Sequence, residues 1–126
     1  MVSYNDLPVL LDTNFVLSCC KFRIHLEEID SIVDERHYIT VPQNVLDELN
    51  QLPLTGADQK AQTIMLAVLT RYPVIPLKGL VDASLLEYAK KHQCIVCTND
   101  RALRRELRNM GRRTIFVRAR SHLAIE

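Results

Sequence analysis

Residues 9–14 read VLLDTN. In this stretch three aliphatic residues are followed directly by an acid, Asp12. An uninterrupted apolar run is typical of a strand covered on both faces, as in a parallel sheet flanked by helices. Asp12 would then lie just past the carboxyl end of this strand, where open α/β sheets keep their ligand crevices. The same position also suits the N-cap of a following helix, so Asp12 alone does not distinguish a chemical role from a structural one.

Strands and helices alternate along the rest of the chain. Apolar or β-branched stretches predict strands at 38–41, 73–77, 94–98 and 114–117, and helical periodicity predicts helices at 26–35, 42–52 and 57–72, from Asp82 and after Asp100. This alternation predicts a three-layer α/β/α domain with a mainly parallel sheet. At 126 residues the chain is too short for two such domains, so we expect residues 1–126 to form one.

Composition is that of an ordinary soluble globular protein, with 48% apolar and 25% charged residues. No apolar run approaches the roughly 20 residues that a membrane-spanning helix needs. Residues 1–8 lack the positive start and apolar block of a signal peptide, so we expect a cytoplasmic protein without a membrane partner.

Four cysteines raise the question of a metal site or a disulfide. Cys94 and Cys97 have the spacing of a zinc knuckle, but they fall in a predicted strand, where residues three apart point to opposite faces. Cys19 and Cys20 are adjacent and cannot easily share one site. We therefore expect reduced, mostly buried thiols.

Acids recur where the predicted strands end. A helix of about eleven residues opens at Asp82 and advances about 16 Å, and the strand before Asp100 returns about the same distance. Asp82 and Asp100 therefore reach one edge of the sheet, and Asp12 reaches it too because parallel strands share a direction. In the helix after the second strand, Glu48 lies at the edge of the apolar stripe and can lean over this edge, whereas Asp47 points away.

Four carboxylates at one edge repel one another and raise each other's pKa, so they are costly without a cation. Mg²⁺ or Mn²⁺, held by carboxylates and water, would remove this cost. Phosphodiester hydrolysis is the chemistry that uses such ions, because they lower the pKa of the attacking water and stabilise the leaving oxygen. The alternative is that the four acids are unrelated helix caps and surface residues.

Four short blocks resemble the motif blocks of PIN domains, in that family's order. They lie at residues 11–15 (LDTNF), 45–49 (VLDEL), 82–86 (DASLL) with Ala89, and 95–100 (IVCTND) with Leu103. The resemblance implies an α/β/α sandwich with a five-stranded, mainly parallel sheet in the order 3-2-1-4-5, and a Mg²⁺- or Mn²⁺-dependent endoribonuclease acting on single-stranded RNA. By position, the resemblance matches the family's catalytic, metal-binding tetrad to Asp12, Glu48, Asp82 and Asp100, and its supporting polar positions to Asn14 and Thr98.

Two departures from the family pattern concern the metal. Many ribosome-assembly PIN nucleases have two adjacent aspartates at the third block, where this chain has Val81 before Asp82. Relatives with a further acid after the fourth block have it at the position of Ala102, so a second ion would be held weakly here.

Within the family, residues 78–79, 92–94 and 122–126 look like those of PIN nucleases that process small-subunit ribosomal RNA. The alternatives are a VapC-type toxin nuclease and a PIN scaffold that binds RNA or protein without cutting. The implied partners are single-stranded RNA, such as rRNA, a second copy in a homodimer, and a ribosome-assembly or antitoxin protein.

Arginines are concentrated near the end of the chain. Between residues 101 and 120, eight arginines are opposed only by Glu106. We expect RNA phosphate contacts from Arg101, Arg104, Arg105 and Arg108, the alternative being a solvated helix face. Aromatic residues are only 6% of the chain, so no stacking platform is evident and recognition through shape and backbone is predicted.

Overall fold

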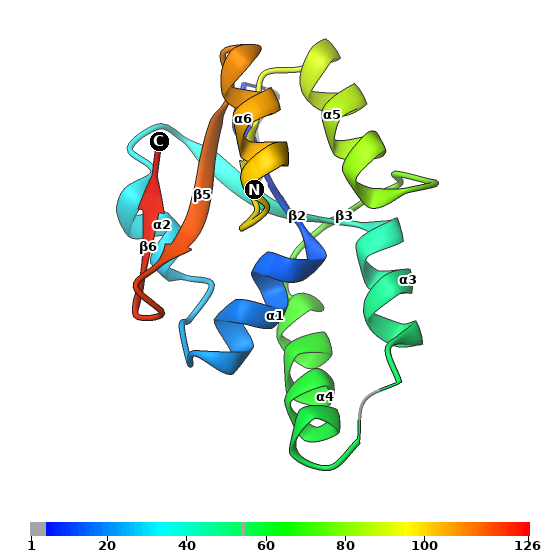
Figure 1. Cartoon of the computed structure of the whole chain (residues 1–126). Helices are drawn as coiled ribbons and strands as arrows, with labels where there is room; N and C mark the ends of the chain where they lie inside the picture. The colour runs from blue at the N-terminus through cyan, green and yellow to red at the C-terminus, as the bar shows by residue number, and fades with distance from the viewer. Residues whose placement is uncertain (1–4, 54) are drawn as a thin grey trace.

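One sheet with helices on both faces makes up the computed structural model, which describes residues 5–53 and 55–126. The elements in chain order are β1 (Leu7–Leu11), α1 (Thr13–Lys21), α2 (Glu28–Ile32), β2 (His37–Pro42), α3 (Gln43–Gln51), α4 (Ala57–Leu69), β3 (Val74–Ile75), α5 (Val81–Lys91), β4 (Ile95–Cys97), α6 (Arg101–Asn109), β5 (Arg113–Arg118) and β6 (His122–Ile125). Helices α1, α3 and α4 pack together on one side, and α5 packs against α6 on the other (Figure 1). The three layers predicted from the alternation are therefore confirmed.

The strand order is β3-β2-β1-β4-β5-β6. The first five strands are parallel and follow the predicted order, and β6 adds an antiparallel edge strand that the sequence analysis missed. The turn before β6 places Ala119 and Arg120 at a φ of 53° each. Hairpin turns of this kind usually contain glycine or asparagine at such positions, so the sequence carried no recognisable turn signal here.

Two predicted elements are shorter than expected. The helix predicted at 26–35 is confined to α2, because the chain is already extended at Val33 as it approaches β2. The strand predicted at 73–77 is only β3, at the sheet edge. Pro73 and Pro76 flank this strand, and neither has a backbone N–H to donate to a sheet ladder.

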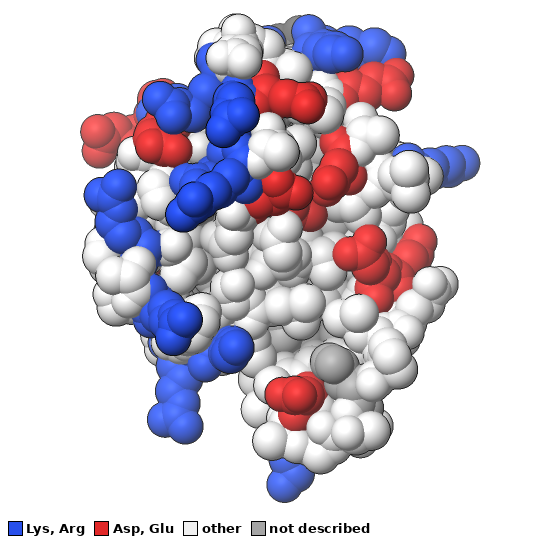
Figure 2. All heavy atoms as spheres, in the orientation of Figure 1, with Lys and Arg blue, Asp and Glu red and all other residues white. Residues whose placement is uncertain are grey.

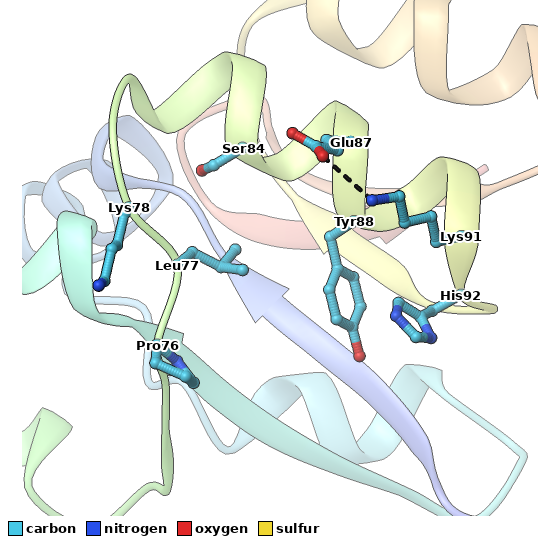
Figure 3. Close-up of a pocket in the computed structure, with 8 residues that line it drawn as sticks. All are labelled: Pro76, Leu77, Lys78, Ser84, Glu87, Tyr88, Lys91 and His92. Carbon is cyan, nitrogen blue, oxygen red and sulfur yellow. Dashed lines mark hydrogen bonds and ion pairs between the residues drawn. The ribbon is translucent and has the colours of Figure 1, made fainter.

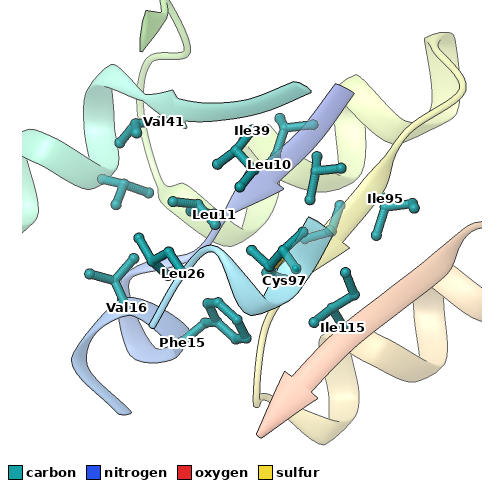
Figure 4. Packing of buried hydrophobic residues seen from close by; sticks show 14 of the residues in the cluster. Leu10, Leu11, Phe15, Val16, Leu26, Ile39, Val41, Ile95, Cys97 and Ile115 are labelled. Carbon is teal, nitrogen blue, oxygen red and sulfur yellow. The ribbon is translucent and has the colours of Figure 1, made fainter. Parts of the chain in front are cut away.

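The centre of the sheet is a dry apolar layer. Leu10 and Leu11 of β1, Ile95 of β4 and Ile115 of β5 have no exposed surface, and the equally buried Phe15 of α1 belongs to the same cluster (Figure 4). Since the middle strands are covered on both faces, they need continuous apolar runs rather than alternation. The apolar run before Asp12 is explained by this arrangement.

Cysteines 19, 20, 94 and 97 are all free, and all but Cys20 are buried. Burial raises the pKa of Cys19 to about 12 and that of Cys94 to about 11, so these thiols stay protonated and unreactive. Among the described residues, no helix has the length and apolar character needed to cross a membrane.

Candidate functional site

Asp12 lies at the carboxyl end of β1 with only 2% of its surface exposed. Its carboxylate accepts hydrogen bonds from the Thr13 backbone N–H at 2.8 Å, the Asn14 amide at 3.1 Å and the Thr98 hydroxyl at 2.7 Å. Burial is the main influence on the pKa of Asp12 and raises it, although the bonds from Thr98 and Thr13 oppose this shift. Asp12 thus caps α1 and is also a buried, oriented carboxylate of the kind common at functional sites.

Strand pairing brings the first and fourth blocks together. Leu11 pairs with Cys97, so the next residues, Asp12 and Thr98, emerge side by side. The Thr98 hydroxyl donates to Asp12 and accepts from the Asp100 backbone N–H at 3.2 Å. One buried hydroxyl therefore connects the two acids that end β1 and β4.

Asp100 caps α6 through one of its two oxygens. Its Oδ1 accepts from the backbone N–H groups of Ala102 and Leu103 at 2.9 and 3.1 Å. No hydrogen bond links Oδ2 to any other part of the chain within the described residues. The cap therefore leaves one carboxylate oxygen of Asp100 available to a ligand.

A side-chain network fixes the loop between β4 and α6. The side-chain carbonyl of Asn14 accepts from the Asn99 backbone N–H at 3.0 Å, while the side-chain amide of Asn14 donates to Asp12. The Asn99 side chain donates to Ser18 at 2.8 Å and accepts from the Val117 N–H at 2.9 Å. Asn14 and Thr98 therefore both orient Asp12, and Asn99 holds this loop against α1 and β5.

A buried asparagine positions the other two acids. Asn44 donates to the Ser84 hydroxyl at 2.8 Å and to the Gly79 carbonyl at 3.2 Å, and these bonds join α3 to the start of α5. Glu48 follows Asn44 by one helical turn, and Asp82 precedes Ser84 by two residues. Both acids are exposed at the surface of the site, in contrast to Asp12.

The four acids act on one another electrostatically. Besides burial, the charges of Asp82 and Glu48 raise the pKa of Asp12. The pKa of Asp82 is raised by burial first, then by Asp100 and Glu48. Figure 2 shows acidic side chains gathered between the N-terminal ends of α5 and α6. The predicted edge of the sheet thus concentrates negative charge from four separate elements.

This arrangement fits a hydrated ion better than a closed cage of protein ligands. Within the described residues, no three Asp, Glu, His or Cys side chains form a group that could hold a metal ion as they stand. Mg²⁺ keeps several waters and is usually held through one or two carboxylates, so acids on separate elements that act through water suit its chemistry. The oxygen-only donor set, with a buried carboxylate of raised pKa at its centre, matches a hard divalent cation.

The sequence analysis gave no role to three residues that shape the site: Asn44, Ser84 and Asn99. Each has a hydrogen bond to a segment 35 or more positions away in the chain, although Ser84 also bonds to Val81 and Asn99 to Val117. A polar residue on an apolar helix face was the available signal for Asn44, since it shares the buried side of α3 with Val45 and Leu49.

The predicted arginine cluster divides into two groups. Arg101 and Arg105 are exposed and form no ion pair within the described residues. Arg104 does not fit the expectation of a solvent-facing phosphate contact, because its guanidinium lies 4.0 Å from the Phe116 ring centroid and 3.2 Å from Glu126. Arg108 is exposed and lies 3.6 Å from the same Glu126. Figure 2 shows the resulting basic band beside the acids, over α6 and along the β5–β6 edge.

Comparison with known proteins identifies the family. A family model described as "PIN like domain" matches residues 9–120, nearly the whole chain. The chain belongs to the PIN-like domain family. This chain is 27% identical over 108 residues to "Ribonuclease VapC9" of Archaeoglobus fulgidus. The aligned region covers 81% of this chain and 76% of the relative. The structure of this chain resembles that of "the PIN domain endonuclease Utp24", with a TM-score of 0.78, 23% identity, and coverage of 94% of this chain and 90% of the other. At that identity the likeness shows the shared fold.

Asn44→Ala tests the connection between α3 and α5 in this PIN-like domain. Because it leaves the buried Ser84 hydroxyl without its donor, we expect a loss of about 1–3 kcal/mol in the free energy of unfolding, measured by urea denaturation. Asn50→Ala removes an exposed amide of the same helix, which bonds to the Leu46 carbonyl, and should cost less than about 0.5 kcal/mol. Equal losses in the two variants would contradict this role of Asn44.

The raised pKa values predict how a divalent ion affects stability. Without the ion, the carboxyls of Asp12 and Asp82 contribute stability that is fully present below pH 3.8 and is lost as pH rises through their raised pKa values. Millimolar Mn²⁺ should therefore raise the melting temperature by about 2–6 °C at neutral pH, and by much less near pH 4, where protonated carboxyls do not ligate. Asp12→Asn should reduce the shift and Asp47→Asn should retain it; an undiminished shift in Asp12→Asn would contradict ligation there.

Proposed function

We propose that this chain is a Mg²⁺- or Mn²⁺-dependent endoribonuclease that hydrolyses phosphodiester bonds of single-stranded RNA. The observation that carries the proposal is the buried Asp12 carboxylate, held by three hydrogen bonds and repelled by Asp82 and Glu48. Membership of a family whose named relatives include a ribonuclease and an endonuclease supports it.

Asp12 and Asp100 supply the fixed side of the proposed centre, and Glu48 and Asp82 supply its exposed side. A divalent ion bound there lowers the pKa of an attacking water and stabilises charge on the leaving oxygen. Asn14 and Thr98 keep the Asp12 carboxylate in one orientation. Val81 is buried in the core, so the position before Asp82 offers no additional oxygen ligand.

Among the roles that such an activity could have, we favour the processing of ribosomal RNA. The reason is that residues 78–79, 92–94 and 122–126 resemble those of PIN nucleases that process small-subunit ribosomal RNA. A ribosome-assembly protein and a second copy of the chain are the partners that go with this role, and the cytoplasm is the proposed compartment. Sequencing of RNA crosslinked to the purified protein in cells tests the role, because rRNA targets separate it from transfer RNA or messenger targets.

A VapC-type toxin is the second candidate. The match to "Ribonuclease VapC9" favours it. A hollow of about 520 Å³ between α1, the end of α3 and α4 also favours it, with an apolar part that includes Leu17 and Met65 and a charged part that includes Lys21, Arg23 and Asp58. A hollow of this kind is a surface that an antitoxin protein would cover. Co-purification of a small protein encoded beside this chain, together with growth arrest on its expression alone, would support the toxin role.

Cleavage itself is tested with the acids. Asp12→Asn and Asp82→Asn should each lower the rate on a single-stranded RNA by at least about 100-fold, because each removes charge from the ion site. EDTA should stop cleavage and added Mn²⁺ should restore it. Asp47→Asn is the matched control, since Asp47 is exposed on the same helix as Glu48 and, within the described residues, bonds only to Gln43. Wild-type rates in Asp12→Asn would remove this carboxylate from the mechanism.

Arg101, Arg105 and Arg108 are the arginines proposed to contact RNA phosphates. Positions 101, 105 and 108 recur at helical spacing, so these side chains share one face of α6. Replacing Arg101 and Arg105 with Ala should weaken RNA binding and make the slope of log affinity against log salt shallower by about 1.4. That slope can be measured by fluorescence anisotropy.

The matched control for this pair is Arg36→Ala with Arg71→Ala. These two arginines come before β2 and β3, so they lie on the side of the amino ends of the parallel strands. The four acids lie on the side of the carboxyl ends. The control removes the same charge and should leave the slope almost unchanged. Equal slopes in both double variants would show that the effect is one of net charge rather than of the α6 face.

A further inference from the structure

Three neighbouring hollows share lining residues along α5, from its start to its end. The first, of about 490 Å³, is lined by Asn44, Asp47 and Glu48, of which Glu48 is the one acid of the proposed ion site, and it extends to Leu77 and Lys78. The second, of about 360 Å³, shares Leu77 and Lys78 with the first and continues along α5. A strand of RNA that leaves Glu48 on this side would meet these neighbouring hollows in turn.

Aromatic rings line the second hollow, which we call the Tyr88 hollow. Tyr88 and His92 project from the same side of α5, with ring centroids 4.5 Å apart and planes inclined by 33° (Figure 3). Pro76 and Leu77 face them from the loop that follows β3. The two rings form a small stacking surface that the sequence analysis did not predict.

The third hollow, of about 340 Å³, continues beyond these two rings. It shares Tyr88 and His92 with the Tyr88 hollow and adds Tyr38. The pKa of Tyr88 is raised first by burial and then by the nearby Tyr38, which is consistent with the proximity of the two rings. Three rings from β2 and α5 therefore gather beside one another, although they are fifty residues apart in the chain.

Positive charge accompanies the rings. Lys78 is exposed, lines both the first hollow and the Tyr88 hollow, and makes no ion pair or hydrogen bond with the described part of the chain. Lys91 lies at the other end of the Tyr88 hollow and contacts Glu87 at 3.1 Å. An exposed pair of this kind contributes little stability, so Lys91 can turn to a phosphate at small cost.

We propose that the Tyr88 hollow is a nucleotide subsite for the RNA strand, in which a base stacks on Tyr88 and His92 and Lys78 contacts the phosphate on the side of the acids. The proposal rests on the proposed function for its choice of ligand. The volume of the Tyr88 hollow lies within the range of small-ligand sites. Aromatic rings can stack on any base, because every base has a π-face. The subsite would hold the strand without selecting its sequence.

Photocrosslinking tests the position of the strand. The probe is a single-stranded RNA of about 12 nucleotides carrying 5-iodouridine, mixed with the full chain in EDTA so that no cleavage occurs. Mass spectrometry of the digested complex should find the RNA attached to Tyr88 or His92. Attachment confined to the α6 arginines would overturn the proposal.

Affinity tests the contribution of stacking. His92→Ala should weaken binding of this RNA by about 5- to 100-fold, and it should have no effect on an RNA of the same length whose nucleotides lack bases. His92 is exposed at the end of α5, so an unchanged melting temperature will show that the variant folds.

Lysine variants test the phosphate contact. Lys78→Ala should make the salt slope shallower by about 0.7. The control is Lys90→Ala, another exposed lysine on α5 that lines none of the three hollows. Weaker binding in Lys78→Ala with an unchanged slope in Lys90→Ala supports the subsite.

The two proposals fail in different ways. If the wild type cuts RNA with Mn²⁺ but His92→Ala and Lys78→Ala bind RNA as well as the wild type, the subsite is wrong and the hydrolysis stands. If these variants lose affinity for an RNA that the wild type never cuts, the subsite stands and the hydrolysis is wrong.

Discussion

The burial of the Asp12 carboxylate at the end of β1 is the constraint on which the site depends. A charged group with 2% exposure is stable only if its oxygens are hydrogen bonded. The Thr13 N–H donates to Oδ1, and Asn14 and Thr98 both donate to Oδ2. Thr98 can do so only because β4 pairs with β1 in the register that aligns Leu11 with Cys97. The sheet register, the orientation of Asp12 and the position of Asp100 are therefore set by the same contacts.

The proposed centre combines a rigid side and an adjustable side. Asp12 and Asp100 are attached to the ends of central strands and are held by backbone and side-chain donors. Glu48 and Asp82 are exposed on helices, and the Asn44 bonds to Ser84 and Gly79 determine how those helices meet. A site of this kind tolerates movement of its outer acids while the buried carboxylate stays in place, which suits an ion that keeps much of its water.

Cations near the site differ in what they are free to do. Arg104 is occupied by the Phe116 ring and Glu126 and so stabilises the join between α6 and the β5–β6 edge. Arg101, Arg105 and Lys78 have no such partner within the described residues and lie on two sides of the acids. Counting charges along the chain did not separate these groups, because the difference is made by Phe116 and Glu126, which are distant from Arg104 in sequence.

Local pattern was sufficient for the fold class and for the acids that follow strands or open helices, because periodicity and strand direction are properties of short segments. The order of the first five strands was implied only by the resemblance to PIN domains. Strand β6 was missed because Ala119 and Arg120 adopt a turn conformation that their side chains do not favour. The roles of Asn44 and Asn99, the engagement of Arg104, and the meeting of Tyr38 with Tyr88 and His92 were decided only by tertiary packing. Each depends on which surfaces face one another after the strands pair. Local sequence pattern does not show which residues distant in the chain become neighbours in this way.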